Sequence, residues 1–210
     1  MANYSFISIW ELRAPIEDVW ALISQSMSYS EWFPYVAEAT SLTPGDKSGV
    51  GSVVHTRWTS ALPYSLDFVM RTTRVEQPRL IELVASGDLD GTGRWELSER
   101  GDVTTVRYEW NVSTTKRWMD LVAPLAAPVF GWNHAVVMQA GGEGLAACLG
   151  VDLVRNQSFS EVSKNPLKPV TTTAGLLALV ILGVGWLRRG LTRSQATNPA
   201  PHFPVTVQPC

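Results

Sequence analysis

The sequence predicts an α+β domain in which an antiparallel sheet packs on one face of a long C-terminal helix. Between residues 36 and 112, short runs rich in β-branched and aromatic residues are separated by turn residues. Turn signals at intervals of about ten residues are typical of antiparallel strands. Residues 116–149 are mostly helix-forming, and their apolar residues recur at helical spacing. A chain of 210 residues has room for one such domain with an appendage.

The N-terminal part is expected to contain one strand and two short helices. Residues 4–13 alternate loosely and are rich in Ile, Phe and Trp, as in a strand. Pro15 suits the first turn of a helix. The apolar residues after it share one helical face and are Ile16, Val19, Trp20 and Ile23. Residues 28–35 predict a second short helix that ends near Pro34.

Six further strands and one long helix are expected to follow. The predicted strand ranges are 36–42, 51–58, 64–75, 80–85, 94–98 and 103–112. The helix is predicted over 116–149, where Pro124 and Pro128 indicate a kink or a short preceding helix.

Charged residues on the last two strands predict how these strands pair. If Gly101-Asp102 is the hairpin turn, opposite charges face each other across the pair. The predicted partners are Arg94 with Glu109 and Glu96 with Arg107. This register turns the charged face toward solvent and leaves Trp95, Tyr108 and Trp110 on the other face.

Composition excludes several function classes. The net charge is −2, from 17 Lys and Arg against 19 Asp and Glu. Because nucleic-acid binding needs clustered cations, no nucleic-acid partner is expected. Three His and two Cys residues show no metal-ligand spacing, so no metal is predicted. No phosphate loop, nucleophile motif or dinucleotide motif is present, and neither a cofactor nor a catalytic residue is predicted.

An ordered set of short motifs resembles the helix-grip (SRPBCC) superfamily, which includes START domains and the birch-pollen-allergen group. The segments that carry the resemblance are Ala14-Pro15 with Glu17–Trp20, Trp32-Phe33-Pro34, Gly51, Val75–Arg79, Gly91-Thr92-Gly93 with Trp95–Leu97, and Thr104–Val106. The resemblance covers roughly residues 3–150 and is greatest to the polyketide cyclase/dehydrase-like branch. It implies a curved sheet that grips the long helix, with space between them for an apolar ligand.

Alternation along the predicted strands identifies candidate residues for such a cavity. The candidate ligand-binding residues are Trp58, Phe68, Met70, Leu83, Trp95, Tyr108, Trp110 and His134. An aromatic stripe on a sheet is also typical of a solid core, and a lone His on a helix is commonly structural. An enclosed cavity of several hundred cubic ångströms would favour a binder over a scaffold.

The sequence therefore favours a binding module for a hydrophobic small molecule, such as a lipid, an isoprenoid or a polyketide-like compound. The alternative is an enzyme of the polyketide cyclase/dehydrase type, for which Tyr108 and His134 are the residues to test. A third possibility is a scaffold that recruits a protein partner to the membrane.

Membrane attachment is predicted from residues 170–187, which carry no charge and are followed by Arg188 and Arg189. A helix of this length spans about 27 Å, close to the hydrocarbon thickness. A buried core helix is the alternative. The N-terminus shows no secretory signal pattern, so a single-pass protein with a cytoplasmic N-terminal domain is expected. The predicted organisation is a ligand-binding domain at 1–150, a polar linker at 151–169, the span, and a Pro-rich disordered tail at 188–210.

Overall fold

The protein is described by a computed structural model, which defines residues 3–115 and 117–161. The chain forms β1 (Asn3–Leu12), α1 (Ile16–Ile23), a 3-10 turn η1 (Ser26–Ser28), α2 (Tyr29–Trp32), β2 (Val36–Thr43), β3 (Val53–Trp58), β4 (Leu66–Glu76), β5 (Leu80–Gly87), β6 (Leu89–Arg100), β7 (Val103–Thr114), α3 (Arg117–Leu149) and β8 (Leu153–Glu161). The predicted elements are confirmed, with small shifts at their ends.

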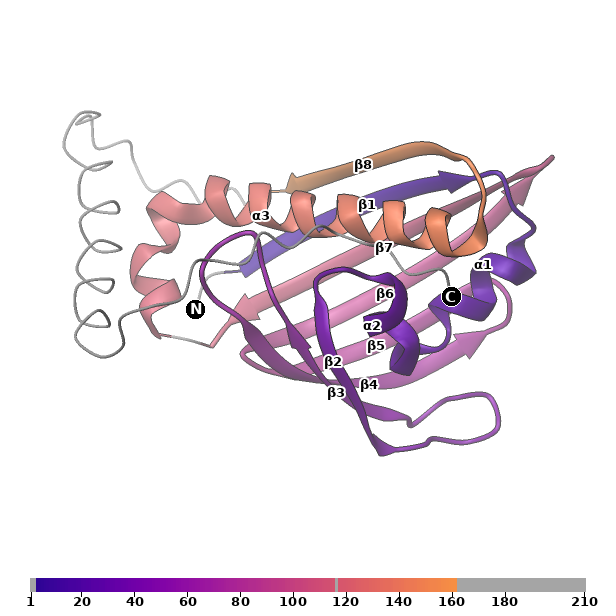
Figure 1. The fold of residues 1–210 in the computed structure, drawn as a ribbon. Coiled ribbons are helices and arrows are strands. Elements are labelled where there is room, and N and C mark those ends of the chain that lie inside the picture. Colours follow the sequence, from indigo (N-terminus) through magenta and orange to yellow (C-terminus); the bar gives the residue numbers. More distant parts are fainter. Residues whose placement is uncertain (1–2, 116, 162–210) are drawn as a thin grey trace, which may run out of the picture. The chain divides into compact units, whose positions relative to one another are not determined.

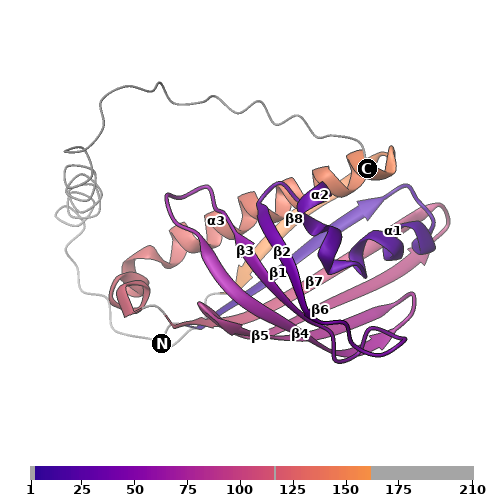
Figure 2. The same ribbon diagram turned by 60° about the horizontal axis from the view of Figure 1, so that its bottom comes forward.

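The eight strands of the described residues form one antiparallel sheet in the order β2-β3-β4-β5-β6-β7-β1-β8. The long helix α3 lies along one face of this sheet, while α1 and α2 lie near the end where β1 finishes (Figures 1 and 2). This arrangement is the helix-grip fold that the sequence predicted.

The predicted pairing of β6 with β7 is confirmed. Arg94 lies opposite Glu109, and Glu96 lies opposite Arg107. An ion pair of 3.1 Å joins Arg107 to Glu96, and another of 3.0 Å joins Arg94 to Glu82 on β5. These side chains are partly exposed, so each pair adds little stability. Their importance is that they define the solvent face of the sheet and so turn the aromatic face toward α3.

The prediction of a polar linker at 151–169 is wrong for residues 153–161, which form the edge strand β8. This strand pairs with β1, and Ser158 Oγ lies 2.9 Å from Ser8 Oγ. Asn156 donates a hydrogen bond of 2.8 Å to the carbonyl of Gln139 on α3. An edge strand needs few apolar residues because backbone pairing and polar contacts hold it, and its sequence therefore resembles a linker.

The rest of the predicted linker, 162–169, the candidate span at 170–187 and the tail at 188–210 lie outside the described residues. Within the part of the chain that the structure describes, no helix is long and apolar enough to span a membrane.

One end of the space between sheet and helix is filled by large aromatic side chains. Trp10 packs against Trp95 and Phe33, with ring centroids 5.6 and 6.2 Å apart. Trp32 packs against Phe33 at 5.3 Å. All four rings are almost completely buried, so this end, beside α1 and α2, is a solid core.

Three glycines allow α3 to approach this core closely. A Cβ at Gly141 would lie 2.3 Å from the Phe33 ring, and one at Gly142 would lie 2.9 Å from Trp10. A Cβ at Gly144 would lie only 1.8 Å from the backbone oxygen of Trp32. Side chains can move away, but this backbone oxygen is held by α2, so Gly144 is the strictest requirement.

Replacing Gly144 with Ala should destabilise the domain by about 1–3 kcal/mol, because α3 would have to move away from α2. Helix propensity alone predicts the opposite effect, an increase of about 1 kcal/mol in the free energy of unfolding. Chemical denaturation of the full-length chain in detergent measures the difference. Gly131→Ala is the matched control, since its Cβ would meet only the Ser160 side chain at 3.1 Å. Equal stability of both variants would contradict the prediction.

Candidate ligand pocket

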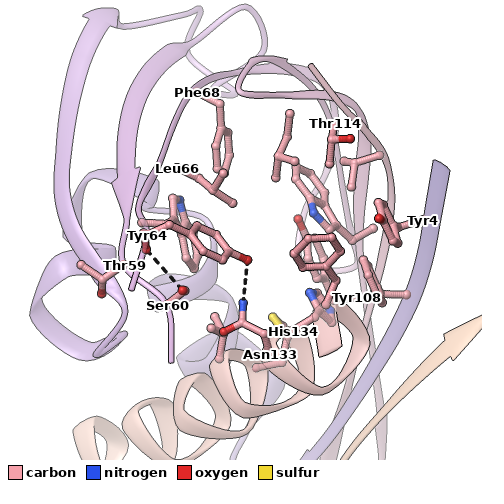
Figure 3. A pocket seen from close by; sticks show the side chains of 18 of the residues that line it. Tyr4, Thr59, Ser60, Tyr64, Leu66, Phe68, Tyr108, Thr114, Asn133 and His134 are labelled. Atoms are coloured by element: carbon pink, nitrogen blue, oxygen red, sulfur yellow. Dashed lines mark hydrogen bonds between the residues drawn. The ribbon is translucent and has the colours of Figure 1, made fainter. Parts of the chain in front are cut away.

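The other end of the space between the sheet and α3 contains a pocket of about 120 Å³ (Figure 3). It lies where β1 begins and β7 ends, beside the middle of α3. The lining residues are Tyr4, Phe6, Trp58, Thr59, Ser60, Tyr64, Leu66, Phe68, Met70, Leu89, Tyr108, Trp110, Val112, Thr114, Phe130, Asn133, His134, Val137 and Met138. This volume is smaller than the several hundred cubic ångströms that would favour a binder over a scaffold.

On β6, Gly91 and Gly93 occupy alternate positions, and Gly93 is buried. A Cβ at Gly93 would lie 2.9 Å from both Leu83 Cδ1 and the Tyr108 hydroxyl. The space beside Gly93 is therefore occupied by side chains of the neighbouring strands. A Cβ at Gly91 would lie only 2.1 Å from the Asn111 backbone oxygen, so this glycine allows β6 and β7 to approach closely. Neither glycine lines the pocket.

Most of the predicted ligand-binding residues line this pocket. They are Trp58, Phe68, Met70, Tyr108, Trp110 and His134. Trp58 stacks on Phe68 with ring centroids 6.2 Å apart, and Tyr108 stacks on Trp110 at 5.8 Å. Aromatic walls of this kind combine apolar contact area with occasional polar atoms.

Leu83 and Trp95 do not line the pocket, although both are buried on the predicted face of the sheet. Trp95 stacks on Tyr108 at 3.9 Å and also contacts Trp10, so it belongs to the solid core. Leu83 fills the space above Gly93. Strand alternation identified their face correctly but carries no information about position along the strand.

Polar atoms gather where α3 meets the segment between β3 and β4. Asn133 is 8% exposed, and its Oδ1 accepts a hydrogen bond of 3.0 Å from the Ala61 backbone N–H. Its Nδ2 donates to the Tyr64 hydroxyl at 3.3 Å, as Figure 3 shows. Ser60 donates to the backbone oxygens of Leu62 and Tyr64. Asn133 therefore fixes this wall of the pocket to α3.

His134 is the second polar group that α3 brings to the pocket. Its ring stacks on Phe6 with centroids 4.1 Å apart, and its buried Nε2 has no hydrogen-bond partner among the described residues. Burial lowers the pKa of His134 to about 3 from the usual 6.5. Burial also raises the pKa of Tyr108 well above 10. Both groups are therefore neutral at physiological pH.

The pocket lining as a whole is uncharged, since none of its described residues is Lys, Arg, Asp or Glu. The ion-paired residues of β5, β6 and β7 lie on the opposite face of the sheet. Among the described residues, no group of three or more His, Cys, Asp or Glu is arranged to hold a metal ion. The site thus offers apolar surface, aromatic faces and a few neutral hydrogen-bonding groups.

A family model described as polyketide cyclase / dehydrase and lipid transport matches residues 10–152. This match covers more than half of the chain. The chain belongs to this family. No curated protein matches it in sequence.

Solved structures similar to this member of the polyketide cyclase/dehydrase and lipid transport family share its fold at low sequence identity. The Zhui aromatase/cyclase from Streptomyces sp. R1128 is 15% identical with a TM-score of 0.57, over 68% of this chain and 91% of that one. A START superfamily protein from Mycobacterium smegmatis is 16% identical with a TM-score of 0.52, over 68% and 99% of the two chains.

The di-domain aromatase/cyclase BexL, from the BE-7585A biosynthetic pathway, is 17% identical with a TM-score of 0.56. The match covers 69% of this chain and 49% of BexL, so the chain spans about half of that di-domain protein. At these identities the comparisons show the fold.

Sequence reasoning missed the part of the pocket contributed by β1, the β3–β4 segment and much of α3. Tyr4 and Phe6 belong to a strand that alternates only loosely in sequence. Phe130 and Met138 lie one turn from His134 on α3, so helical spacing was the available signal for them. Nothing in the sequence indicated that Asn133 binds a backbone N–H 72 residues earlier in the chain.

The low pKa of His134 predicts a pH-dependent stability. The unfolded state takes up a proton near pH 6.5 and the folded state only near pH 3, so stability falls as the pH falls between these values. From pH 7 to pH 5 the loss should reach up to about 2 kcal/mol. His134→Phe keeps a stacking ring and should lack this component in denaturation of the full-length chain. An unchanged pH dependence in that variant would show that folding does not lower the pKa of His134.

Proposed function

We propose that this protein is a membrane-anchored binding module for an uncharged hydrophobic small molecule. A role in hydrophobic ligand binding or cyclisation follows from the family. The observation that favours binding is the aromatic pocket, which has no charged side chain in its lining. An ionic group buried there would have no counter-charge, which costs several kcal/mol or more.

The titration properties of the pocket support binding rather than acid–base catalysis. A general base works best when its pKa is near the operating pH. With a pKa of about 3, His134 is a weak base, and Tyr108 is a correspondingly weak acid. A cyclase/dehydrase remains the second candidate, because the family description covers that activity as well as lipid transport.

The size of the pocket limits what it holds. A lysozyme cavity of about 150 Å³ binds benzene, whereas pockets for drug-sized ligands measure about 300–1,000 Å³. A volume of about 120 Å³ therefore suits one ring or a short hydrocarbon segment. The pocket is partly open, so the rest of a longer ligand would extend out of it.

Residues 170–187 are the proposed membrane anchor, with the N-terminal domain on the cytoplasmic side. Because β8 extends the domain to Glu161, only residues 162–169 connect it to the proposed span. A connection of this length reaches at most about 28 Å. The anchor would hold the pocket near the bilayer and raise its effective concentration for ligands dissolved there.

The proposal predicts selectivity for neutral ligands. Full-length protein in detergent should show a change in Trp fluorescence when it binds phenol, because Trp58 and Trp110 line the pocket. The matched carboxylate benzoate should bind at least about tenfold more weakly, since a difference of 1.4 kcal/mol already gives that factor. Equal affinity for both probes would contradict an uncharged site.

Two Val→Trp variants test the location of binding. Val112 is buried in the pocket, and Val112→Trp should abolish the phenol response by filling the pocket. Val84 is 44% exposed on the opposite face of the sheet, and Val84→Trp should leave the response unchanged. If Val112→Trp binds as well as the control while remaining folded, the probe occupies another site.

A further inference from the structure

The last strand of the described chain ends beside the pocket. Ser160 and Glu161, the last residues of β8, pair with Phe6 and Ser5 of β1. Phe6 lines the pocket. The same end of β8 lies against α3, because a Cβ at Gly131 would meet the Ser160 side chain at 3.1 Å. Gly131 immediately follows another lining residue, so β8 leaves the domain at the pocket.

Large apolar side chains are exposed around this exit point. Trp132 is 53% exposed and Val129 is 43% exposed, both on α3 beside Gly131. Phe159 on β8 is also exposed, but it lies opposite Ile7 and shares the face of the sheet that points away from α3, so it does not belong to this surface. Neither Val129 nor Trp132 lines the pocket. These two side chains, three residues apart on α3, form a separate group, called here the exit cluster.

The polarity of α3 changes along its exposed side. Beyond the exit cluster, exposed Gln139 hydrogen-bonds to Glu143 at 3.1 Å, as on an ordinary solvated helix face. Trp is enriched at membrane interfaces, where its ring lies at the level of the headgroups. A Trp exposed on an otherwise polar, solvated side of a helix is accommodated better at such an interface than in bulk water.

The residues that follow β8 in the sequence indicate what can cover the exit cluster. The proposed span begins within about 28 Å of Glu161. The connecting residues 162–169 include Lys164 and Lys168 and no acidic residue, a charge pattern that favours an anionic bilayer surface. A bilayer surface is thus within reach of the exit cluster.

We infer that the exit cluster of Val129 and Trp132 rests on the membrane surface, so that the pocket end of the domain faces the bilayer. This inference depends on the proposed membrane anchor. It adds a direction of ligand exchange: an uncharged hydrophobic molecule would pass between bilayer and pocket with little exposure to water. The charged face of the sheet would remain in solvent.

Site-specific photo-crosslinking in vesicles tests this orientation. The full-length protein is reconstituted into phosphatidylcholine–phosphatidylglycerol vesicles with p-benzoylphenylalanine replacing Trp132, Val84 or Leu179, one position at a time. Lipid adducts are then counted by mass spectrometry. Trp132 should form several-fold more lipid adducts than Val84, an exposed position away from the cluster, and Leu179 should react strongly from within the proposed span.

Each other outcome is decisive. If position 132 reacts no more than position 84 while position 179 reacts strongly, the proposed membrane anchor is supported and the inferred docking surface is rejected. If Leu179 forms no lipid adduct and the protein does not sediment with the vesicles, both the anchor and the docking surface are wrong. If Trp132 crosslinks to a second copy of the chain instead of to lipid, the cluster is a protein interface and the inference is overturned.

Discussion

The close approach of α3 to α2 and β1 is the contact on which the rest of the domain depends. Gly144 allows the helix to touch the backbone of Trp32, while Gly141 and Gly142 receive the rings of Phe33 and Trp10. Protein interiors are packed nearly as densely as organic crystals, so such a contact fixes the height of the helix above the sheet. A helix held tightly at one end and lying over a curved sheet leaves space at its other end.

Core and pocket lie at different positions along the same face of the sheet. Trp95 of β6 contacts Trp10 in the core. Tyr108 and Trp110 of the neighbouring strand β7 line the pocket. The aromatic residues thus have two structural roles. Those near α1 and α2 fill the core, and those near the start of β1 line the pocket.

The chemistry of the pocket follows from the segregation of charge across the sheet. Strand alternation places Arg94, Glu96 and Arg107 on the solvent face, and the described residues that line the pocket on the inner face are all uncharged. His134 is consistent with this segregation, because burial keeps it neutral. A site of this kind discriminates by shape and by the penalty for burying an unpaired charge, which suits a ligand dissolved in a membrane.

Periodicity in the sequence was enough to establish the fold class, the long helix, the pairing of β6 with β7 and the face that carries the aromatic residues. These features depend on residues that are close together in the chain, or on the pairing register of two adjacent strands. The alternation of polar and apolar residues indicates both. The position of a residue along the buried face depends on contacts between distant segments. Only the tertiary structure therefore separated Trp95, in the core, from Trp110, in the pocket, and joined Asn133 to Ala61. For the same reason it alone revealed β8, whose polar residues resemble a linker until β1 and α3 supply their partners.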